Sequence, residues 1–184
     1  MNHIQHPYCK LALSLKEDHP HWLYHDREYG FPTHDDDELF GRLILEINQA
    51  GLSWLTILKK KSQLKKAYAN FNIEKVAAFQ ESDINRLLAD PGIIRNRLKI
   101  KAAIYNAQSI LELQKEYGSF EGFLDQHNGL ELADWVKLFK KHFKFTGGEI
   151  CNEFLRSNAY LPAAHDPNCP IYQKIILLGP PWAK

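Results

Sequence analysis

The feature that most limits the fold of this chain is the helical spacing of its apolar residues. Leu39, Leu43 and Ile47 recur at intervals of four, which places them on one face of an α-helix. The same kind of spacing returns later in the chain, at Ile100, Ile104, Ala107 and Leu111. We find no sustained alternation of apolar and polar residues, which would indicate a half-buried β-strand. The pattern therefore predicts an all-α fold.

Capping residues and chain breakers predict where these helices begin and end. The first long helix should follow the acidic residues 35–38, whose negative charge suits a helix N-terminus. Gly51 should end this helix, and Ser53 should cap the next helix, whose apolar face extends to Phe71. We expect Asn72 and Ser82 to cap two short helices. A long helix should then run from about Asn96 and end at Gly118. Two more helices should cover about residues 132–143 and follow Gly147-Gly148. We expect the proline-rich last twenty residues to form an irregular tail, and the N-terminal segment carries no strong helical signal.

Length and composition limit the class of protein. A chain of 184 residues with 45% hydrophobic residues suits one folded domain. Its net charge of +1 means that any nucleic-acid surface must come from local clustering of basic residues. No apolar run approaches the roughly 20 residues that a membrane span needs, and residues 1–10 lack the apolar core of a signal peptide. We therefore expect an intracellular, cytoplasmic protein that makes no membrane contact.

Residues 87–97 have the outline of a helix-hairpin-helix, with Pro91-Gly92 between two helical segments. Glycine lets a backbone approach a phosphate closely, and the free N–H groups of the next helix can point at it. Arg95 and Arg97 add positive charge there, so Gly92, Arg95 and Arg97 are candidate DNA-backbone contacts. The alternative is an ordinary helical turn before a solvated basic helix. The lysines of residues 59–66 allow the same two interpretations, a DNA-backbone contact or a solvated basic helix face.

Cysteine and histidine at both ends of the chain suggest a metal site. The spacing His165-x3-Cys169 can place two ligands on one metal ion, and Cys9 and His25 could complete a Cys2His2 set suited to tetrahedral zinc. Three cysteines cannot all pair within one chain, and in a cytosolic chain cysteine near histidine suggests a metal site before a disulfide. The alternative is that these are unrelated surface residues.

Glu46 and Trp54 form a third candidate feature. Glu46 lies near the end of an apolar helix, and Trp54 begins the next helix after the turn at Gly51. A carboxylate beside an aromatic plane suits a flat base that is cationic or carries an amine. The alternative is a solvent-facing glutamate and a core tryptophan.

Several motifs in order resemble one known family. The string YHDREYGFP at residues 24–32 resembles the YHDxEWGxP signature of the 3-methyladenine DNA glycosylase I family. LEINQAGLSW at residues 45–54 is similar to that family's LExxQAGLSW. GIIRNR at residues 92–97 and the closing His165-x3-Cys169 also fit, so the resemblance runs from about Asp18 to Cys169.

The resemblance implies a helix-hairpin-helix DNA glycosylase fold. It would be a single domain over residues 1–184, in which lobes of about residues 1–34 and 146–184 are joined by a structural zinc. The implied activity is base-excision repair: monofunctional hydrolysis of the N-glycosidic bond of 3-methyladenine in double-stranded DNA. The partner would then be DNA carrying alkylated bases, with the protein a monomer associated with the nucleoid. By the same resemblance, zinc is held by Cys9, His25, His165 and Cys169, the base is recognised by Tyr24, Glu46 and Trp54, and Glu46 is the catalytic candidate.

The sequence departs from the family pattern at a few positions. The usual Cys-x-Trp reads Cys9-Lys10-Leu11, and the segment from Cys9 to His25 is longer, which leaves His3, His6, His19 and His21 as alternative fourth ligands. Tyr29 replaces the signature tryptophan, His21 a usual tyrosine, and Glu153 a small hydroxyl residue. These changes leave two other functions open: an inactive DNA-binding homologue and a zinc-dependent hydrolase of small molecules.

Overall fold

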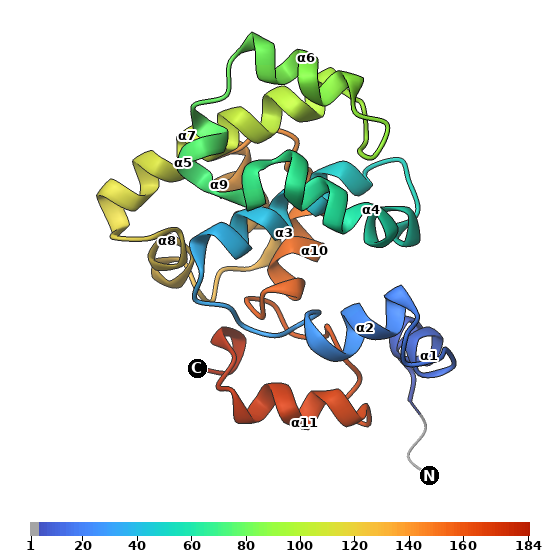
Figure 1. Cartoon of the computed structure of the whole chain (residues 1–184). Helices are drawn as coiled ribbons and strands as arrows, with labels where there is room; N and C mark the ends of the chain where they lie inside the picture. Colours follow the sequence, from blue (N-terminus) through green and yellow to red (C-terminus); the bar gives the residue numbers. More distant parts are fainter. Residues whose placement is uncertain (1–3) are drawn as a thin grey trace.

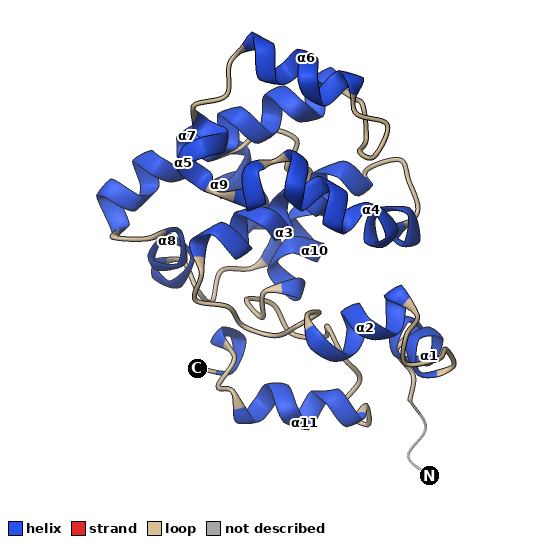
Figure 2. Cartoon of the chain, viewed as in Figure 1, coloured by secondary structure: helices blue, strands red, loops and turns tan. Residues whose placement is uncertain are grey.

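The computed structural model describes residues 4–184, and within that range every regular element is a helix (Figure 2). This confirms the all-α prediction for the part of the chain described. The elements are α1 (Pro7–Leu13), α2 (Pro20–Arg27), α3 (Asp36–Gln49), α4 (Trp54–Ala67), η1 (Ala69–Phe71), α5 (Ile73–Ala77), α6 (Glu81–Ala89), α7 (Arg97–Tyr117), α8 (Phe120–Gln126), α9 (Leu132–His142), α10 (Gly148–Ser157), α11 (Pro170–Leu177) and η2 (Pro181–Ala183). None of these helices has the length and apolarity needed to cross a membrane.

Helix α3 lies at the centre of the molecule (Figure 1). Every residue from Leu39 to Asn48 is buried, which is typical of a helix that other elements surround. The helix begins within the acidic run rather than after it, because the Asp35 side chain caps it by accepting the N–H groups of Asp37 and Glu38. It ends at Gln49, and Gly51 follows with a φ of +81°, as the predicted stop requires.

Helix α4 begins as predicted but ends earlier. The Ser53 side chain accepts the N–H of Thr56, which confirms the predicted cap. The helix stops at Ala67, so its expected extension to Phe71 is wrong, because residues 69–71 all adopt a positive φ. Phe71 remains in the core, where its ring packs so closely on Gly41 of α3 that a Cβ there would lie 2.4 Å from it.

The predicted caps around the hairpin are partly confirmed. Asn72 caps α5 by accepting the N–H of Lys75. The prediction of Ser82 as a cap is wrong, because α6 already begins at Glu81 and the Asp83 carboxylate accepts the N–H of Gln80. Helices α6 and α7 flank the turn at residues 90–96, and α7 runs from its cap Asn96 to Gly118, as expected.

The two ends of the chain form helices where none was expected. The prediction of an irregular C-terminal tail is wrong, because Pro170–Leu177 forms α11. The N-terminal segment forms α1 and α2. Proline is tolerated at the first position of a helix, where its missing N–H is not needed, and all three helices start with it. Helices α1, α2 and α11 occupy the lower part of the view in Figure 1. Cys9, Cys169, Ile171 and Ile175 pack there in a small cluster of their own.

Arg42 connects the central helix to this lower part. Its side chain is buried, and Nη1 donates to the carbonyl oxygens of Glu28 (3.3 Å), Phe31 (2.9 Å) and Ser157 (2.8 Å). Nη2 bonds the carboxylate of Glu38 at 2.5 Å. One guanidinium group therefore fixes the loop after α2 and the end of α10 against α3.

Candidate active site

A cavity of about 480 Å³ lies among α1, α2, α10 and the adjoining ends of α3 and α4. Its walls include Tyr8, Tyr24, Glu46, Trp54, Glu153 and Arg156. The three residues predicted to recognise a base, Tyr24, Glu46 and Trp54, are therefore brought together at one cavity. A larger cavity of about 600 Å³ lies between α3 and α4, but its charged groups include the ion pairs Glu28–Lys61 and Glu38–Arg42.

Glu46 is the most unusual residue of the smaller cavity. It lies in the last turn of α3 and is only 5% exposed. No hydrogen bond from residues 4–184 reaches its carboxyl group, so nothing offsets the cost of burying its charge. Burial, and after it the charge of Glu153, raises the pKa of Glu46 well above its ordinary value. The carboxyl group is thus prepared to interact with a ligand that enters the cavity.

Two aromatic side chains form the wall beside Glu46. Trp54 is the first residue of α4, so the cap at Ser53 fixes the start of the helix and with it the position of Trp54. The buried Tyr24 of α2 meets Trp54 edge-on, with 5.1 Å between ring centroids and 63° between the planes. An aromatic-walled space with carboxyl groups is suited to a heteroaromatic ring that carries donors or positive charge.

The structure adds cavity residues that the sequence did not single out. Tyr8 comes from α1, and its hydroxyl lies 3.2 Å from Nδ1 of His21. Gln49 lies on α3 one turn after Glu46, and Arg156 on α10 one turn after Glu153. The helical spacing of Gln49 and Arg156 is a signal that could have identified both, whereas Tyr8 reaches the cavity only because the N-terminus folds back.

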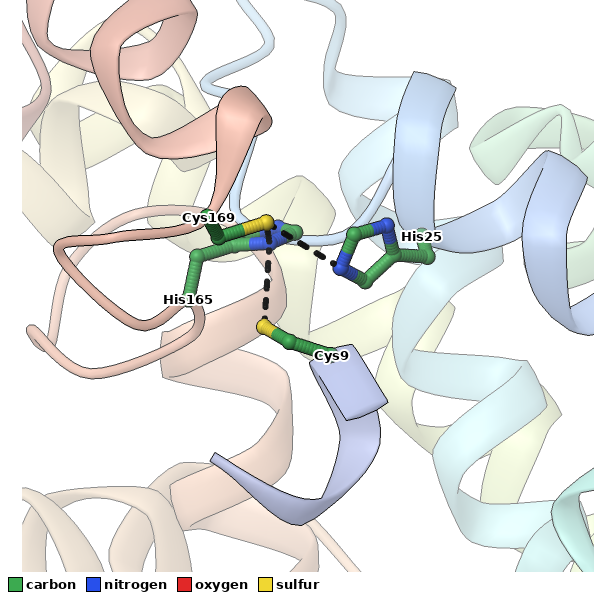
Figure 3. Close-up of side chains that lie close together, drawn as sticks. All are labelled: Cys9, His25, His165 and Cys169. Atoms are coloured by element: carbon green, nitrogen blue, oxygen red, sulfur yellow. Dashed lines mark hydrogen bonds between the residues drawn. The ribbon is translucent and has the colours of Figure 1, made fainter. Parts of the chain in front are cut away.

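Four buried side chains from both ends of the chain form a separate group (Figure 3). The ligand atoms of Cys9, His25, His165 and Cys169 all lie within 4.8 Å of one another. The Cys169 sulfur is 3.6 Å from Nε2 of His25 and 3.7 Å from Nδ1 of His165, and the Cys9 sulfur is also 3.7 Å from that Nδ1. A tetrahedral zinc ion with bonds of about 2.3 Å to sulfur and 2.0 Å to nitrogen separates a sulfur and a nitrogen ligand by about 3.5 Å. The group therefore fits a metal ion of this kind.

Hydrogen bonds outside the group fix the orientation of both imidazoles. His165 Nε2 lies 2.7 Å from the carbonyl oxygen of Tyr29, which can only accept, so this nitrogen carries the proton and Nδ1 faces the thiols. His25 Nδ1 bonds the Asp26 carboxylate at 2.6 Å, which leaves Nε2 toward Cys169. Hydrogen bonding from Cys9, followed by that from His165 and His25, lowers the pKa of the Cys169 thiol. A thiolate and two unprotonated nitrogens are the ligands that zinc takes.

The approach of the two chain ends depends on particular residues. Gly30 has a φ of +76°, and a Cβ there would lie 2.8 Å from Ala164, so only glycine lets the His165 loop pack this closely. The Asp166 carboxylate accepts the N–H groups of Gln5 (2.5 Å) and His6 (3.0 Å). Of the alternative fourth ligands, His6, His19 and His21 lie outside the group, and His3 is outside the described residues.

The hairpin has backbone N–H groups at its turn without an internal partner among the described residues. Lys60 of α4 donates to the carbonyl oxygens of Pro91 and Gly92, each at 3.1 Å, and so fixes the turn. The N–H of Gly92 bonds the Asp90 carboxylate at 2.7 Å, while the N–H groups of Ile94 and Arg95 have no partner in the described structure. The free donors thus lie just after Gly92 rather than on it.

The basic side chains near this turn differ in their exposure and in their partners. Arg95 is exposed, whereas Arg97 pairs with Glu81 at the surface. Lys99 is buried and donates to the carbonyl oxygens of Asn48 (2.9 Å) and Ala50 (2.7 Å). Lys99 therefore connects the first turn of α7 to the end of α3, three residues beyond Glu46.

Comparison with known proteins identifies the family. A family model described as methyladenine glycosylase matches residues 15–134. DNA-3-methyladenine glycosylase 1 of Escherichia coli is 35% identical over 162 residues, which cover 78% of this chain and 87% of that protein. This chain belongs to the 3-methyladenine DNA glycosylase I family.

Solved structures of 3-methyladenine DNA glycosylase I have the same fold. One is a tyrosine-to-phenylalanine variant in complex with 3-methyladenine. This structure superposes on the chain with a TM-score of 0.80 at 34% sequence identity, and the match covers 88% of this chain and 96% of that chain. Another is a glutamate-to-glutamine variant from Staphylococcus aureus, with a TM-score of 0.79, 34% identity and the same coverage. The all-helical architecture described above is thus that of the family.

The positions at which this chain departs from the 3-methyladenine DNA glycosylase I pattern all occur at one place. Leu11, His21, Tyr29 and Glu153 each line the cavity that contains Glu46. Leu11 and Glu153 also lie outside residues 15–134, the range that the family model matches. These four replacements therefore all change the lining of one cavity.

Proposed function

We propose that this protein is a monofunctional DNA glycosylase of base-excision repair that hydrolyses the N-glycosidic bond of 3-methyladenine in DNA. The observation that carries the proposal is the buried carboxyl group of Glu46, which has no hydrogen bond from the described chain and lines the same cavity as Trp54. The relatives named as DNA-3-methyladenine glycosylases support it.

The chemistry of the substrate explains why so few catalytic groups are needed. Alkylation at N3 makes the base a cation, so the bond between C1′ and N9 breaks with its electron pair passing to the ring, and the base leaves neutral. Water adds its oxygen to C1′ and releases a proton to solvent. Extruding the nucleotide costs a few kcal/mol, and less for a damaged base. The protein must therefore mainly hold the base and admit water.

Each cavity residue has a role in this proposal. Trp54 and Tyr24 flank the flat base, and the Glu46 carboxylate faces its positive charge. Glu46 is the catalytic candidate because a buried carboxylate can stabilise the positive charge of the bound nucleotide as that charge shifts from the base to the sugar. We assign no general base. The burial of Glu46 also favours the charged lesion over an undamaged adenine.

The hairpin supplies the contact to double-stranded DNA. The free N–H groups of Ile94 and Arg95 suit a phosphate, and the exposed Arg95 side chain adds charge. Gly92 contributes by leaving room for the phosphate, and Arg97 joins if its pair with Glu81 opens. Since DNA is the substrate, we place a monomeric protein with chromosomal DNA in the cytoplasm.

The Cys9, His25, His165 and Cys169 group would hold a structural zinc ion that joins two lobes, about residues 1–34 and 146–184, within one domain. Four buried protein ligands leave no position for a reacting water, so the ion would stabilise structure rather than activate a nucleophile. The same reasoning disfavours the small-molecule zinc hydrolase.

Single-turnover release of 3-methyladenine from methylated DNA tests the proposal. Glu46→Gln keeps the size of the side chain and removes its charge. We expect release to slow by about tenfold to a hundredfold, the equivalent of roughly 1.5–3 kcal/mol for one charge-assisted contact. Glu112→Gln, on the exposed side of α7, is the matched control and should release the base as the wild type does.

Two outcomes contradict this assignment. Equal rates for wild type and Glu46→Gln would remove the catalytic role from Glu46. No release by the wild type, with DNA binding retained, would leave an inactive DNA-binding homologue. That alternative has a specific observation in its favour, since Leu11, His21, Tyr29 and Glu153 all alter the cavity.

A further inference from the structure

Glu153 gives the cavity a second carboxyl group. It lies in the middle of α10, lines the cavity that contains Glu46, and has a side chain that is 40% exposed. The Tyr29 hydroxyl donates to its Oε2 at 3.0 Å, and the Asn152 amide approaches Oε1 at 3.4 Å. These contacts hold the carboxylate at the wall of the cavity rather than leaving it free in solvent.

The two carboxyl groups interact electrostatically. The charge of Glu153 is the second cause, after burial, of the raised pKa of Glu46. An empty cavity therefore favours a proton on Glu46, because Glu46 is buried and a second carboxylate lines the same cavity. A cation entering the cavity reverses this preference, since it can interact with both carboxylates at once.

Other charged or titratable groups face the same space. Arg156 also lines the cavity, with Nη1 3.9 Å from Oε1 of Glu153, and its buried Nε has no partner in the described residues. His6 and His21 come from the N-terminal side, and burial is the first cause that lowers the pKa of each. Among the described residues that line the cavity, Arg156 is thus the one permanent cation beside two acids, so the charge of the wall still suits a positive ligand.

We propose that Glu153 is a second recognition carboxylate, which makes this cavity select bases by their positive charge, with Tyr29 as its positioning residue. The inference rests on the proposed function and deepens it. When an N3-alkylated base enters, Glu46 gives its proton to solvent, and both carboxylates face the cationic ring. A neutral base leaves Glu46 protonated and carries no charge for Glu153 to attract.

Two small probes of nearly equal shape measure this selectivity. The 3,9-dimethyladeninium cation carries the fixed charge of the damaged nucleoside, and 3-methyladenine at pH 8 is neutral. Calorimetric or NMR titration should give a wild-type preference for the cation of about tenfold or more. Glu153→Gln should reduce that preference about fivefold to tenfold while changing the affinity for 3-methyladenine less than about twofold.

The controls separate charge recognition from folding. Glu149→Gln changes an exposed glutamate of the same helix and should keep the wild-type preference. Tyr29→Phe removes only the hydroxyl and should lower the preference by a smaller factor, at an unchanged melting temperature. In Glu153→Gln, the pH at which cation binding increases should also fall, because Glu46 loses its proton more easily. A preference unchanged in Glu153→Gln overturns the inference.

Release from methylated DNA distinguishes this inference from the proposed function. If the wild type prefers the cation through Glu153 but releases no base, the inference stands and the proposed activity is wrong. A wild type that releases 3-methyladenine with a cation preference independent of Glu153 keeps the activity and overturns the inference.

Discussion

Glu46 combines burial with the lack of an internal partner, a combination that proteins usually avoid. A buried polar group without a hydrogen bond costs about 1–3 kcal/mol. In this chain the cost falls on a residue whose charge is useful only when a ligand is present. The same side chain therefore reduces stability and provides recognition, and the two effects can be measured separately.

The pH dependence of stability should reveal this cost. Because burial raises the pKa of Glu46, the native chain retains this proton to a higher pH than the unfolded chain does. Above about pH 4.3 the unfolded state loses the proton first, so stability falls with rising pH until the native carboxyl group also titrates. Glu46→Gln should match the wild type near pH 4.5 and exceed its unfolding free energy by about 1–3 kcal/mol at pH 8.

Equilibrium denaturation at several pH values checks this expectation, with Glu112→Gln as the exposed control. A difference between wild type and Glu46→Gln that does not vary with pH would mean that Glu46 titrates alike in the folded and unfolded states.

At the level of elements, the hairpin depends on a lysine from a different helix. Lys60 lies in a run of lysines that sequence reasoning could assign to solvent or to DNA, yet its ammonium group bonds two carbonyl oxygens of the turn. Arg95 makes no such internal contact and is exposed. Two basic residues of the same surface should therefore affect DNA binding in different ways.

Salt titrations of DNA affinity distinguish the two residues. Arg95→Ala should lower the slope of log affinity against log salt by about one unit, because one phosphate contact is lost. Lys60→Met should weaken binding at every salt concentration with little change in slope, because it disturbs the turn rather than a phosphate contact. Equal slope changes in both variants would show that Lys60 itself contacts the DNA.

The elements also show what the sequence can predict. The long helix from Asn96 to Gly118 and the cap at Ser53 were predictable because local spacing and capping chemistry determine them. The helix from Pro170 was not, because its prolines read as breakers and its burial depends on packing with Cys9. Glu46 and Trp54 lie close together in the sequence and were found from it, and Tyr24 was found through the family resemblance, whereas Tyr8 reaches the cavity only through tertiary folding.

At the scale of the whole molecule, two distant segments depend on one small group of ligands. The ends of the chain pack in a cluster of few buried residues, which is separate from the main core. A structural metal is the usual way to stabilise a region with so little apolar surface. The metal should therefore affect the terminal helices more than the core.

Metal removal tests this dependence. Chelation or Cys169→Ala should lower the melting temperature by about 10 °C or more, since a loss of several kcal/mol shifts a chain of this size by about 2–4 °C per kcal/mol. Cys151→Ala changes a buried cysteine outside the group and should retain one zinc per chain by elemental analysis. Full zinc content in Cys169→Ala, or no zinc in the wild type, contradicts the assignment.

The anchoring of α1 on the His165 loop has a consequence for the order of synthesis. Glu46, Tyr24 and Trp54 leave the ribosome long before His165, Asp166 and Cys169, which hold the N-terminal wall with Tyr8 in place. A chain still being made has the recognising acid but an incomplete cavity around it. The protein therefore becomes able to enclose a base only when its last segment has joined its first, and an unfinished chain cannot trap a damaged nucleotide.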